Sequence, residues 1–267
     1  MLSYTLKNCK IYVINDNYVI LSKINEILGC QIKDNKILWR KSIYDEVSIS
    51  DHFIACEDSD SNSVTLLNIR DGTEFKNIHI LEFFYLTKTY IITTNDNYHY
   101  KRINIYNNTS INFKLNKNIH SICDDKLLLT ANSSIATSSG TSNCLIYDVD
   151  SFKILETRQI PILSHILYEN NYLVIYDYNQ IKVINKEIEK TYIMEKLHKH
   201  TNQQIAGEHD MIYNMSISND GNKVVINNGH KMQIINIDSS QIKLINSDKL
   251  ICDVKFYQED KLLISNI

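Results

Sequence analysis

The residues best suited to chemistry gather in one polar stretch, 198–210, which reads HKHTNQQIAGEHD. This stretch contains three of the nine histidines, His198, His200 and His209, together with Glu208. Imidazole nitrogens and carboxylate oxygens are common zinc ligands, so this set could in principle bind the metal. No local pattern fixes the distance between the first two histidines and the third. A solvated polar loop is therefore the favoured interpretation, and we expect neither a metal nor a cofactor.

Other catalytic patterns do not occur in the sequence. It contains no Gly-x-Ser-x-Gly motif, no glycine-rich phosphate-binding loop and no Cys–His arrangement of plausible spacing. The six cysteines are scattered without a close pair, and several lie inside apolar runs: Cys9, Cys30, Cys56, Cys123, Cys144 and Cys252. This distribution is typical of small buried side chains rather than of disulfides or metal ligands. We therefore expect a protein that is not an enzyme.

Charge and hydropathy exclude further classes. The chain has 28 Lys and Arg against 31 Asp and Glu, for a net charge of -3, and lacks the basic stripe expected of a nucleic-acid-binding protein. The N-terminal residues MLSYTLKNCKIYVIND lack the layout of a signal peptide. The most apolar stretch, ILEFFYL (80–86), falls far short of the ~18 residues of a membrane span. We expect an intracellular, cytoplasmic protein that binds neither nucleic acid nor membranes.

The elements that would carry any site follow a repeating pattern. Seven short apolar runs begin at residues 18, 53, 90, 127, 172, 224 and 262, at spacings of 35, 37, 37, 45, 52 and 38 residues. The runs read YVIL, FIAC, YIITT, LLLT, YLVIY, VVIN and LLIS, and each follows a polar turn. Runs this short and this rich in β-branched and aromatic residues are typical of strands, and their lack of polar alternation indicates burial on both faces.

A second strand pattern follows these runs and ends in Asn or Asp. Its members are VTLLN (64–68), INIYN (103–107), CLIYD (144–148), IKVIN (181–185) and MQIIN (232–236), with ILGCQ (27–31) as a weaker sixth. Asn and Asp side chains bond to the backbone two residues further on and so open turns. Each repeat of ~40 residues therefore predicts four short antiparallel strands, which is the period of a propeller blade.

Two stretches resemble WD repeats. The segment SNCLIYDVDSFKIL (142–155) is similar to the third and fourth strands of such a repeat, with Tyr147-Asp148 in the place of Trp-Asp. The segment 207–236 resembles a nearly complete repeat, in which Gly207 takes the Gly position of Gly-His and SNDG (218–221) stands where Ser-Pro-Asp-Gly is usual. The resemblance implies a WD-like β-propeller and a role in protein assembly or substrate recruitment.

The sequence departs from the WD pattern at its most specific positions. Glu208 occupies the expected His position and His209 comes one place late, while the single tryptophan, Trp39, falls in an outer strand. The buried His–Ser–Trp–Asp network of well-kept WD repeats is therefore expected to be missing from most blades. We interpret the chain as a degenerate WD40-like repeat β-propeller.

The number of blades depends on how the two ends of the chain pair. The C-terminal part supplies two strands, 250–257 and 261–267, and residues 2–7 form a strand that precedes the first complete repeat. Pairing these three strands covers an edge that would otherwise expose backbone groups. We expect a single all-β domain over residues 1–267, with seven blades and a mixed three-stranded last blade. The alternative is six blades and a terminal extension.

Strand direction also predicts where a partner binds. The longest irregular stretches, 57–62, 132–143 and 198–210, all fall on the same face of the expected propeller, and long loops on a rigid scaffold often carry function. We expect a monomeric, non-catalytic scaffold that binds another protein through this face, with His198, His200, Glu208 and His209 in the footprint. The alternative is a propeller enzyme or small-ligand binder that uses the central channel.

Overall fold

A computed structural model describes residues 3–7, 9–15, 17–34, 36–42, 47–58, 63–80, 83–94, 96, 98–123, 125–130, 141–161, 164–169, 171–177, 180–193, 214–257 and 261–266. These residues form 27 strands and no helix. In the described part of the chain, no helical segment could cross a membrane. By its internal contacts the chain divides into two compact units: unit 1 comprises residues 1–16 and 163–267, and unit 2 comprises residues 17–162.

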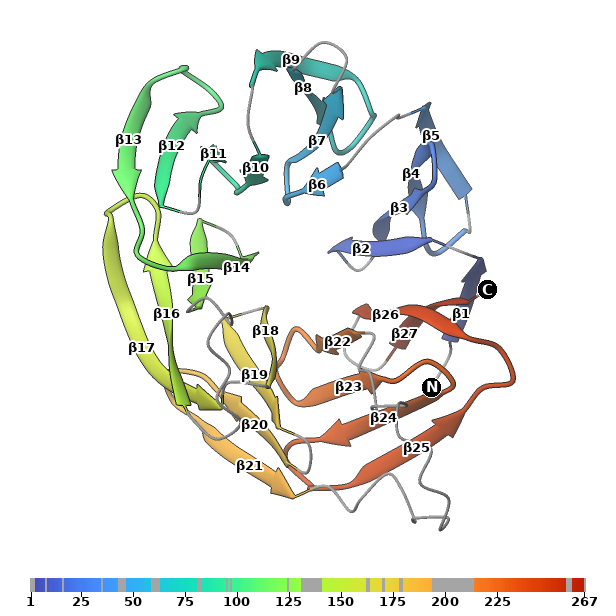
Figure 1. Cartoon of the computed structure of the whole chain (residues 1–267). Coiled ribbons are helices and arrows are strands. Elements are labelled where there is room, and N and C mark those ends of the chain that lie inside the picture. The colour runs from blue at the N-terminus through green and yellow to red at the C-terminus, as the bar shows by residue number, and fades with distance from the viewer. Residues whose placement is uncertain are drawn as a thin grey trace, which may run out of the picture. The chain divides into compact units, whose positions relative to one another are not determined.

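Six sheets each contain four consecutive antiparallel strands (Figure 1). The first three are β2 (Lys10–Asn15), β3 (Tyr18–Lys23), β4 (Glu26–Gln31) and β5 (Lys36–Ser42); β6 (Val47–Ile49), β7 (Phe53–Asp58), β8 (Ser63–Asn68) and β9 (Glu74–His79); and β10 (Phe83–Leu86), β11 (Tyr90–Thr94), β12 (His99–Asn104) and β13 (Ser110–Lys114).

The next three are β14 (Asn118–Cys123), β15 (Lys126–Thr130), β16 (Thr141–Asp148) and β17 (Lys153–Pro161); β18 (His165–Glu169), β19 (Tyr172–Asp177), β20 (Gln180–Ile184) and β21 (Glu189–Ile193); and β22 (Asn214–Ile217), β23 (Lys223–Asn227), β24 (Lys231–Asn236) and β25 (Ile242–Asn246). Within every sheet the strands follow chain order, so that the second and third strands have neighbours on both sides.

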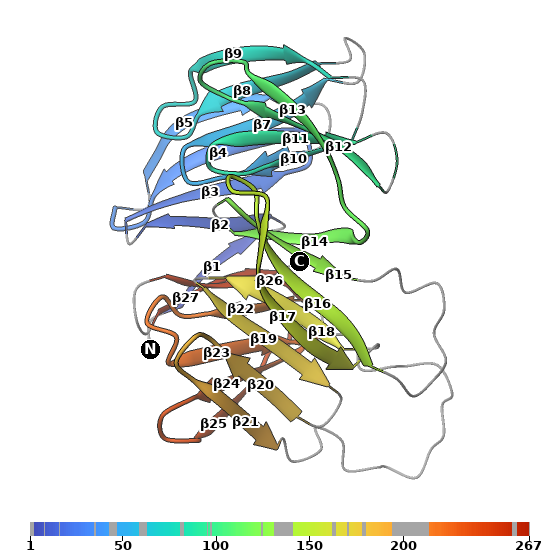
Figure 2. The same cartoon turned by 90° about the vertical axis from the view of Figure 1, so that its left-hand side faces the viewer.

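The seventh sheet, in unit 1, joins the two ends of the chain and has three strands. Here β1 (Ser3–Lys7) pairs in parallel with β27 (Lys261–Asn266), which pairs antiparallel with β26 (Ile251–Tyr257) (Figure 2). The predicted pairing of residues 2–7 with the C-terminal hairpin is confirmed by this register. The predicted count of seven blades needs correction, because the structure contains six complete four-stranded blades. The short sheet has fewer strands because the two chain ends supply only three.

The seven apolar runs form the core of the sheets, as predicted. Each lies within a second strand, or within β27 of the mixed sheet, and most of its side chains are buried. In unit 2, buried residues of β7, β8 and β11 pack together, and those of β11 and β15 form a second cluster. In unit 1, one cluster joins β19, β20, β23 and β24, and another joins β23, β24, β26 and β27. A strand covered on both faces needs no polar alternation, which explains the sequence pattern.

The Asn and Asp residues at the strand ends open turns as expected. The backbone N–H two residues on donates to the Oδ1 of Asn68 at 3.1 Å and of Asn185 at 2.8 Å, and the N–H three residues on donates to Asp148 at 2.6 Å and to Asn236 at 2.9 Å. One strand end was predicted three residues too late. β12 ends at Asn104 rather than at 107, because the side chain of Asn104 already accepts the turn bonds.

Candidate functional site

The residues predicted for partner binding, His198, His200, Glu208 and His209, lie outside the described residues. The loop 198–210 that contains them lies outside the described residues, and so do most residues of the two other loops predicted on the same face, 57–62 and 132–143. The site prediction therefore stays a prediction. The structure does describe several clusters of polar and charged side chains in both units, and their geometry shows what each of them can do.

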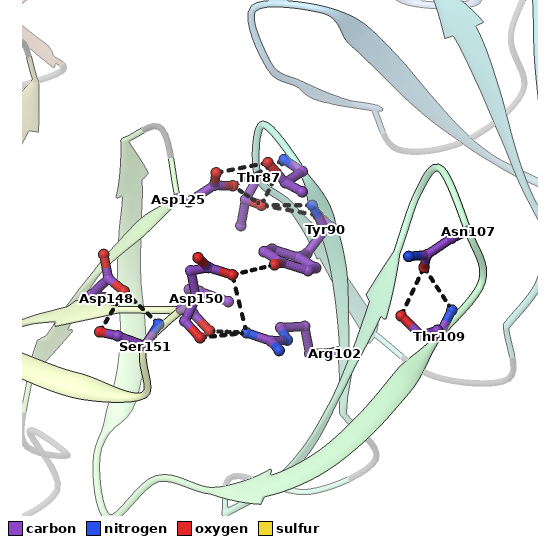
Figure 3. Close-up of polar contacts among 11 residues, drawn as sticks. Thr87, Tyr90, Arg102, Asn107, Thr109, Asp125, Asp148, Asp150 and Ser151 are labelled. Carbon is purple, nitrogen blue, oxygen red and sulfur yellow. Dashed lines mark hydrogen bonds and ion pairs between the residues drawn. The ribbon is translucent and has the colours of Figure 1, made fainter.

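The densest cluster lies in unit 2 around Arg102 of β12 (Figure 3). Its buried guanidinium lies over the rings of Tyr90, at 4.4 Å, and Phe152, at 4.2 Å from the ring centroids. It donates hydrogen bonds to the backbone carbonyls of Val149 and, at 3.1 Å, of Asp150. The hydroxyl of Tyr90 in turn donates to the Asp150 carboxylate. Stacking and carbonyl bonds together compensate for the burial of the charge.

This cluster connects two sheets. Tyr90 and Arg102 belong to β11 and β12, whereas Phe152 and Asp150 lie in the turn between β16 and β17. Burial, followed by the bond to Asp150, raises the pKa of Tyr90, so the hydroxyl keeps its proton as a donor at neutral pH. These hydrogen bonds of Arg102 and Tyr90 both run to the turn between β16 and β17, so the cluster joins the two sheets.

A second joint in the same region is built on Asp125, in the turn before β15. One carboxylate oxygen accepts from the Thr87 hydroxyl at 2.7 Å and from the Thr89 backbone N–H at 2.9 Å, and the other accepts from the Thr89 hydroxyl at 2.8 Å (Figure 3). The carboxylate thus bonds to the turn between β10 and β11 of the preceding sheet. Hydrogen bonds to a carboxylate are stronger than those between neutral groups, so these bonds are well suited to hold the two sheets together.

A tyrosine at the start of the second strand makes a related contact in both units. In unit 2, the Tyr18 hydroxyl donates to the Ile69 carbonyl and accepts a bond of 2.6 Å from the Trp39 indole. In unit 1, the Tyr172 hydroxyl donates to the Asp220 carbonyl at 3.2 Å. Each of these aromatic groups packs against a glycine, Trp39 against Gly72 and Tyr172 against Gly221. The single tryptophan lies in the outer strand β5, as predicted, and takes part in an aromatic joint.

Gly72 and Gly221 are required at these contacts for two reasons. Both have positive φ, of 69° and 73°, which favours glycine. A Cβ on Gly72 would lie 2.7 Å from the Trp39 ring, and one on Gly221 would lie 2.0 Å from the Tyr172 ring. The SNDG turn that resembles the WD motif therefore owes its glycine to a neighbouring aromatic ring as well as to the turn itself.

The charged cluster of unit 1 lies on the first strands of its sheets. The Lys255 ammonium is 3.4 Å from a carboxylate oxygen of Glu169, whose other oxygen accepts from the Ser216 hydroxyl at 3.4 Å and the Ile217 N–H at 3.3 Å. Burial disfavours the charge on Lys255, but the Glu169 and Asp253 carboxylates outweigh it, and its pKa is raised. The Lys255 ammonium and the Glu169 carboxylate therefore form an ion pair.

Asp253 of β26 forms the buried centre of this region. Its carboxylate accepts from the Ile11 N–H of β2 at 2.6 Å, from the Val254 N–H at 2.9 Å and from the Asn214 side-chain amide of β22. Burial raises the pKa of Asp253 despite these donors. Asp253 thus joins the N-terminal strand β2 to two sheets from the C-terminal part of the chain.

The described polar residues give no sign of metal chemistry. No group of three or more His, Cys, Asp or Glu side chains among them is arranged to hold an ion. Burial raises the pKa of the Cys56 and Cys144 thiols to about 11, so both remain protonated and are poor ligands and nucleophiles at neutral pH.

Sequence reasoning missed the joints, although some signals were present. Arg102 alternates with exposed residues on β12 and so falls on the buried side of that strand, where an arginine needs partners. Asp125 lies in one of the polar turns that precede the apolar runs, but its partners in 87–89 belong to a different repeat, which local pattern could not reveal. The partners of Asp253 likewise come from separate repeats, β2 and β22, which local pattern could not reveal.

Comparison with known proteins supports the fold. No protein-family model matches the chain, and no curated protein matches it. Among solved structures, the Myceliophteria thermophila Cps50 (Swd1) β-propeller domain is 10% identical, with a TM-score of 0.62 over 95% of this chain and 91% of that one. Kluyveromyces lactis Hsv2 with loop 6CD replaced by a Gly-Ser linker is 10% identical, with a TM-score of 0.67 over 97% and 90%.

A further similar structure is hydrazine synthase of Kuenenia stuttgartiensis, which is 12% identical, with a TM-score of 0.62 over 96% of this chain and 89% of that one. At such low identity these likenesses show the fold alone. Together with the repeated four-stranded sheets, they define the class: the chain has the all-β fold of a β-propeller.

Proposed function

We propose that this protein is a non-catalytic interaction scaffold of the WD-repeat type that binds another protein. The observation that carries the proposal is that the polar clusters bond within the protein while large apolar side chains are exposed on its surface. The polar clusters around Arg102, Asp125 and Asp253 bond to neighbouring sheets. Meanwhile, eleven large apolar side chains of the described residues stay exposed, several of them on outer strands. Exposed apolar groups on a rigid scaffold are a common feature of protein-binding surfaces.

The finer architecture belongs to the same proposal. We take the repeats as degenerate WD40-like repeats in which aromatic joints such as Tyr18–Trp39 do the work of the Trp-Asp network. The mixed sheet of β1, β27 and β26 is an addition to the six blades and joins the two ends of the chain. The protein acts as a cytoplasmic monomer until its partner binds, and the loop 198–210, with His198, His200, Glu208 and His209, contributes to the binding face.

Affinity purification of the tagged full chain from its native cell tests this function. The expected result is a protein recovered reproducibly and in constant ratio. A variant in which 198–210 is shortened to a tight turn should recover less of that protein if the loop belongs to the site. Recovery of no protein above an untagged control would overturn the scaffold proposal, and undiminished recovery by the folded loop variant would remove the loop from the site.

A small-ligand binder is the second candidate, and one observation favours it. Lys255, Glu169 and Ser216 lie on first strands of unit 1, and the nearby buried Oδ1 of Asn214 has no hydrogen-bond partner in the described structure. A ligand with a donor group could satisfy that oxygen. Thermal-shift measurements with panels of amines, carboxylates and phosphates test this candidate. A saturable rise in Tm that Lys255→Met abolishes would favour it over the scaffold.

A further inference from the structure

The outer strands of unit 2 expose large apolar side chains. On β5, Ile37 and Leu38 are 47% and 46% exposed, and on β9 Phe75 is 47% exposed. Leu155 on β17 is 50% exposed. Scattered single apolar residues are normal on protein surfaces, but these recur on the last strand of successive sheets, so they form a pattern that follows the repeat.

Most of these residues lie at β-bulges. The register passes from Gly29–Trp39 to Cys30–Ile37 and leaves Leu38 as the extra residue of β5. It skips Phe75 on β9 and Leu155 on β17 in the same way. A bulge twists an edge strand and interrupts its row of backbone groups, which hinders the addition of another strand. A partner at these edges would therefore bind through side chains.

Strand β5 contacts the turn that precedes β9, and β9 contacts the turn that precedes β13. The Trp39 ring of β5 packs against Gly72 in the turn before β9, as described above. The Phe75 ring lies 4.8 Å from that of the buried Phe53 and 6.4 Å from that of Tyr106, which is 57% exposed in the turn before β13. Ile37, Leu38, Trp39, Phe75 and Tyr106, called the outer stripe below, thus extend over three sheets of unit 2.

The charge around the outer stripe is opposite to that of the whole protein. The sequence of β5, KILWRKS, contains three basic residues and no acidic one, whereas the chain carries a net charge of -3. Lys36 and Lys41 are exposed, while Arg40 is 3.5 Å from Glu26. Over β5, β9 and β13, the outer strands of the three sheets that the outer stripe spans, there are five Lys or Arg residues and one Glu residue. An acidic partner complements this surface.

We propose that the outer stripe binds an acidic segment of a partner protein that also carries apolar side chains. The apolar groups of the segment pack on Leu38, Phe75 and Tyr106, and its carboxylates face Lys36 and Lys41. The bulges keep the segment from joining the sheet as an additional strand. This inference rests on the proposed scaffold function and specifies its partner.

Fluorescence anisotropy with a labelled probe tests the proposal on the full chain. The probe is a synthetic twelve-residue peptide of alternating Asp or Glu and Leu or Phe, and a second peptide replaces every acidic residue by Lys. The acidic probe should bind more tightly, and its binding should weaken as salt is raised, since screening acts on exposed charges. The double variants Leu38→Ser with Phe75→Ser and Lys36→Glu with Lys41→Glu should each weaken binding by about tenfold or more.

Matched controls come from β25 of unit 1, where Leu244 is 52% exposed and Lys243 is its exposed neighbour. Leu244→Ser and Lys243→Glu remove the same side-chain types away from the outer stripe, and they should leave the affinity for the probe within about twofold of the wild type. Circular dichroism and urea unfolding show whether each variant is folded. The charge variants change only exposed side chains and so keep the test valid if the apolar variants unfold.

Three results would overturn the proposal. The acidic and basic peptides could bind equally, or the β25 control variants could weaken binding as much as the stripe variants do. In the third result, the protein binds vesicles of anionic phospholipid, and the stripe variants abolish vesicle binding but leave peptide binding unchanged.

Affinity purification separates this inference from the scaffold function. If the wild type and both stripe variants recover the same partner equally, the stripe is not the docking surface, although the scaffold function stands. If the wild type recovers none, the scaffold function fails.

Discussion

The joints of the two units hold charge in different ways. In unit 2, Asp150 and Asp125 stand in turns, and the Asp150 side chain is 72% exposed beside Arg102. In unit 1, Asp253 is buried between β2, β22 and β26. An exposed carboxylate loses little hydration when it forms a joint, whereas a buried one must recover that loss from its hydrogen bonds. The joint that connects the two ends of the chain is therefore the more costly one to build and the more costly one to break.

The units also differ in how the chain forms them. Unit 2 is one continuous stretch, so its sheets form from strands that are close in sequence. Unit 1 combines the first 16 residues with residues 163–267, and its mixed sheet pairs β1 with β27 across nearly the whole chain. Closing a large loop costs more entropy than closing a short one. Unit 1 should therefore be the more sensitive to changes at the ends of the chain.

The largest effect is expected from deletion of residues 2–7. Without β1, one side of β27 becomes a free edge, and unpaired edges promote association. The midpoint of thermal unfolding should fall markedly, and light scattering should detect oligomers. Substitution of Ile242 and Leu244 by Ser, on an outer strand of the same unit, serves as the control. A truncated protein as stable and monomeric as the full chain would show that β1 does not hold unit 1 together.

Replacement of Asp253 by Ala should have the next largest effect. It leaves the Ile11 and Val254 N–H groups and the Asn214 amide without their acceptor, at ~1–3 kcal/mol for each buried group that finds no new partner. Urea unfolding should show a loss of about 3 kcal/mol or more. Asp150→Ala, which removes an exposed carboxylate from the unit 2 joint, should cost much less. Equal losses would refute the contrast between buried and exposed joints.

Arg102 provides a test inside unit 2. Arg102→Ala should destabilise the protein by about 2–3 kcal/mol, because it leaves carbonyl groups unbonded and opens a void between Tyr90 and Phe152. Arg102→Lys should recover only part of this loss, since an ammonium cannot stack as a planar guanidinium does. Full recovery by lysine in urea unfolding would mean that charge alone, and not stacking, matters at this joint.

The smallest effect is a difference in pH dependence. Bonds from Ser151 lower the pKa of Asp148, so its contribution to stability is present above the unfolded pKa of ~3.9 and is lost as the pH falls through the folded value. Burial raises the pKa of Asp253, so its contribution has the opposite sign: it is present at low pH and is lost as the pH rises through the folded value.

Urea midpoints of the wild type, Asp148→Asn and Asp253→Asn, measured from pH 3 to pH 7, should reveal the two signs. Relative to Asp148→Asn, the wild type should lose stability below about pH 4. Relative to Asp253→Asn, it should gain stability as the pH falls from 7 towards 4. Parallel curves for all three proteins would show that neither carboxylate titrates differently in the folded state.

Much of the fold was predictable because it depends on local pattern. The doubly covered strands follow from apolar runs such as YIITT (90–94), and the turns after Asn68 and Asn236 follow from side chains that bond the nearby backbone. The predicted end of the strand 103–107 was three residues late. Residues 104 and 107 are both Asn, and periodicity alone could not choose between them. The pairing of β1 with β27 was predictable since a free edge strand is unfavourable.

The candidate sites depended on contacts that no local pattern records. The sequence by itself determined where strands and turns lie, because these depend on side-chain burial periodicity and on bonds between residues two to five apart. Only the tertiary structure decided that Arg102 stacks between Tyr90 and Phe152, that Asp253 accepts from Ile11, and that exposed Leu38 and Phe75 lie at bulges. These contacts join separate repeats, and their partners are selected by how sheets pack in space rather than by distance along the chain.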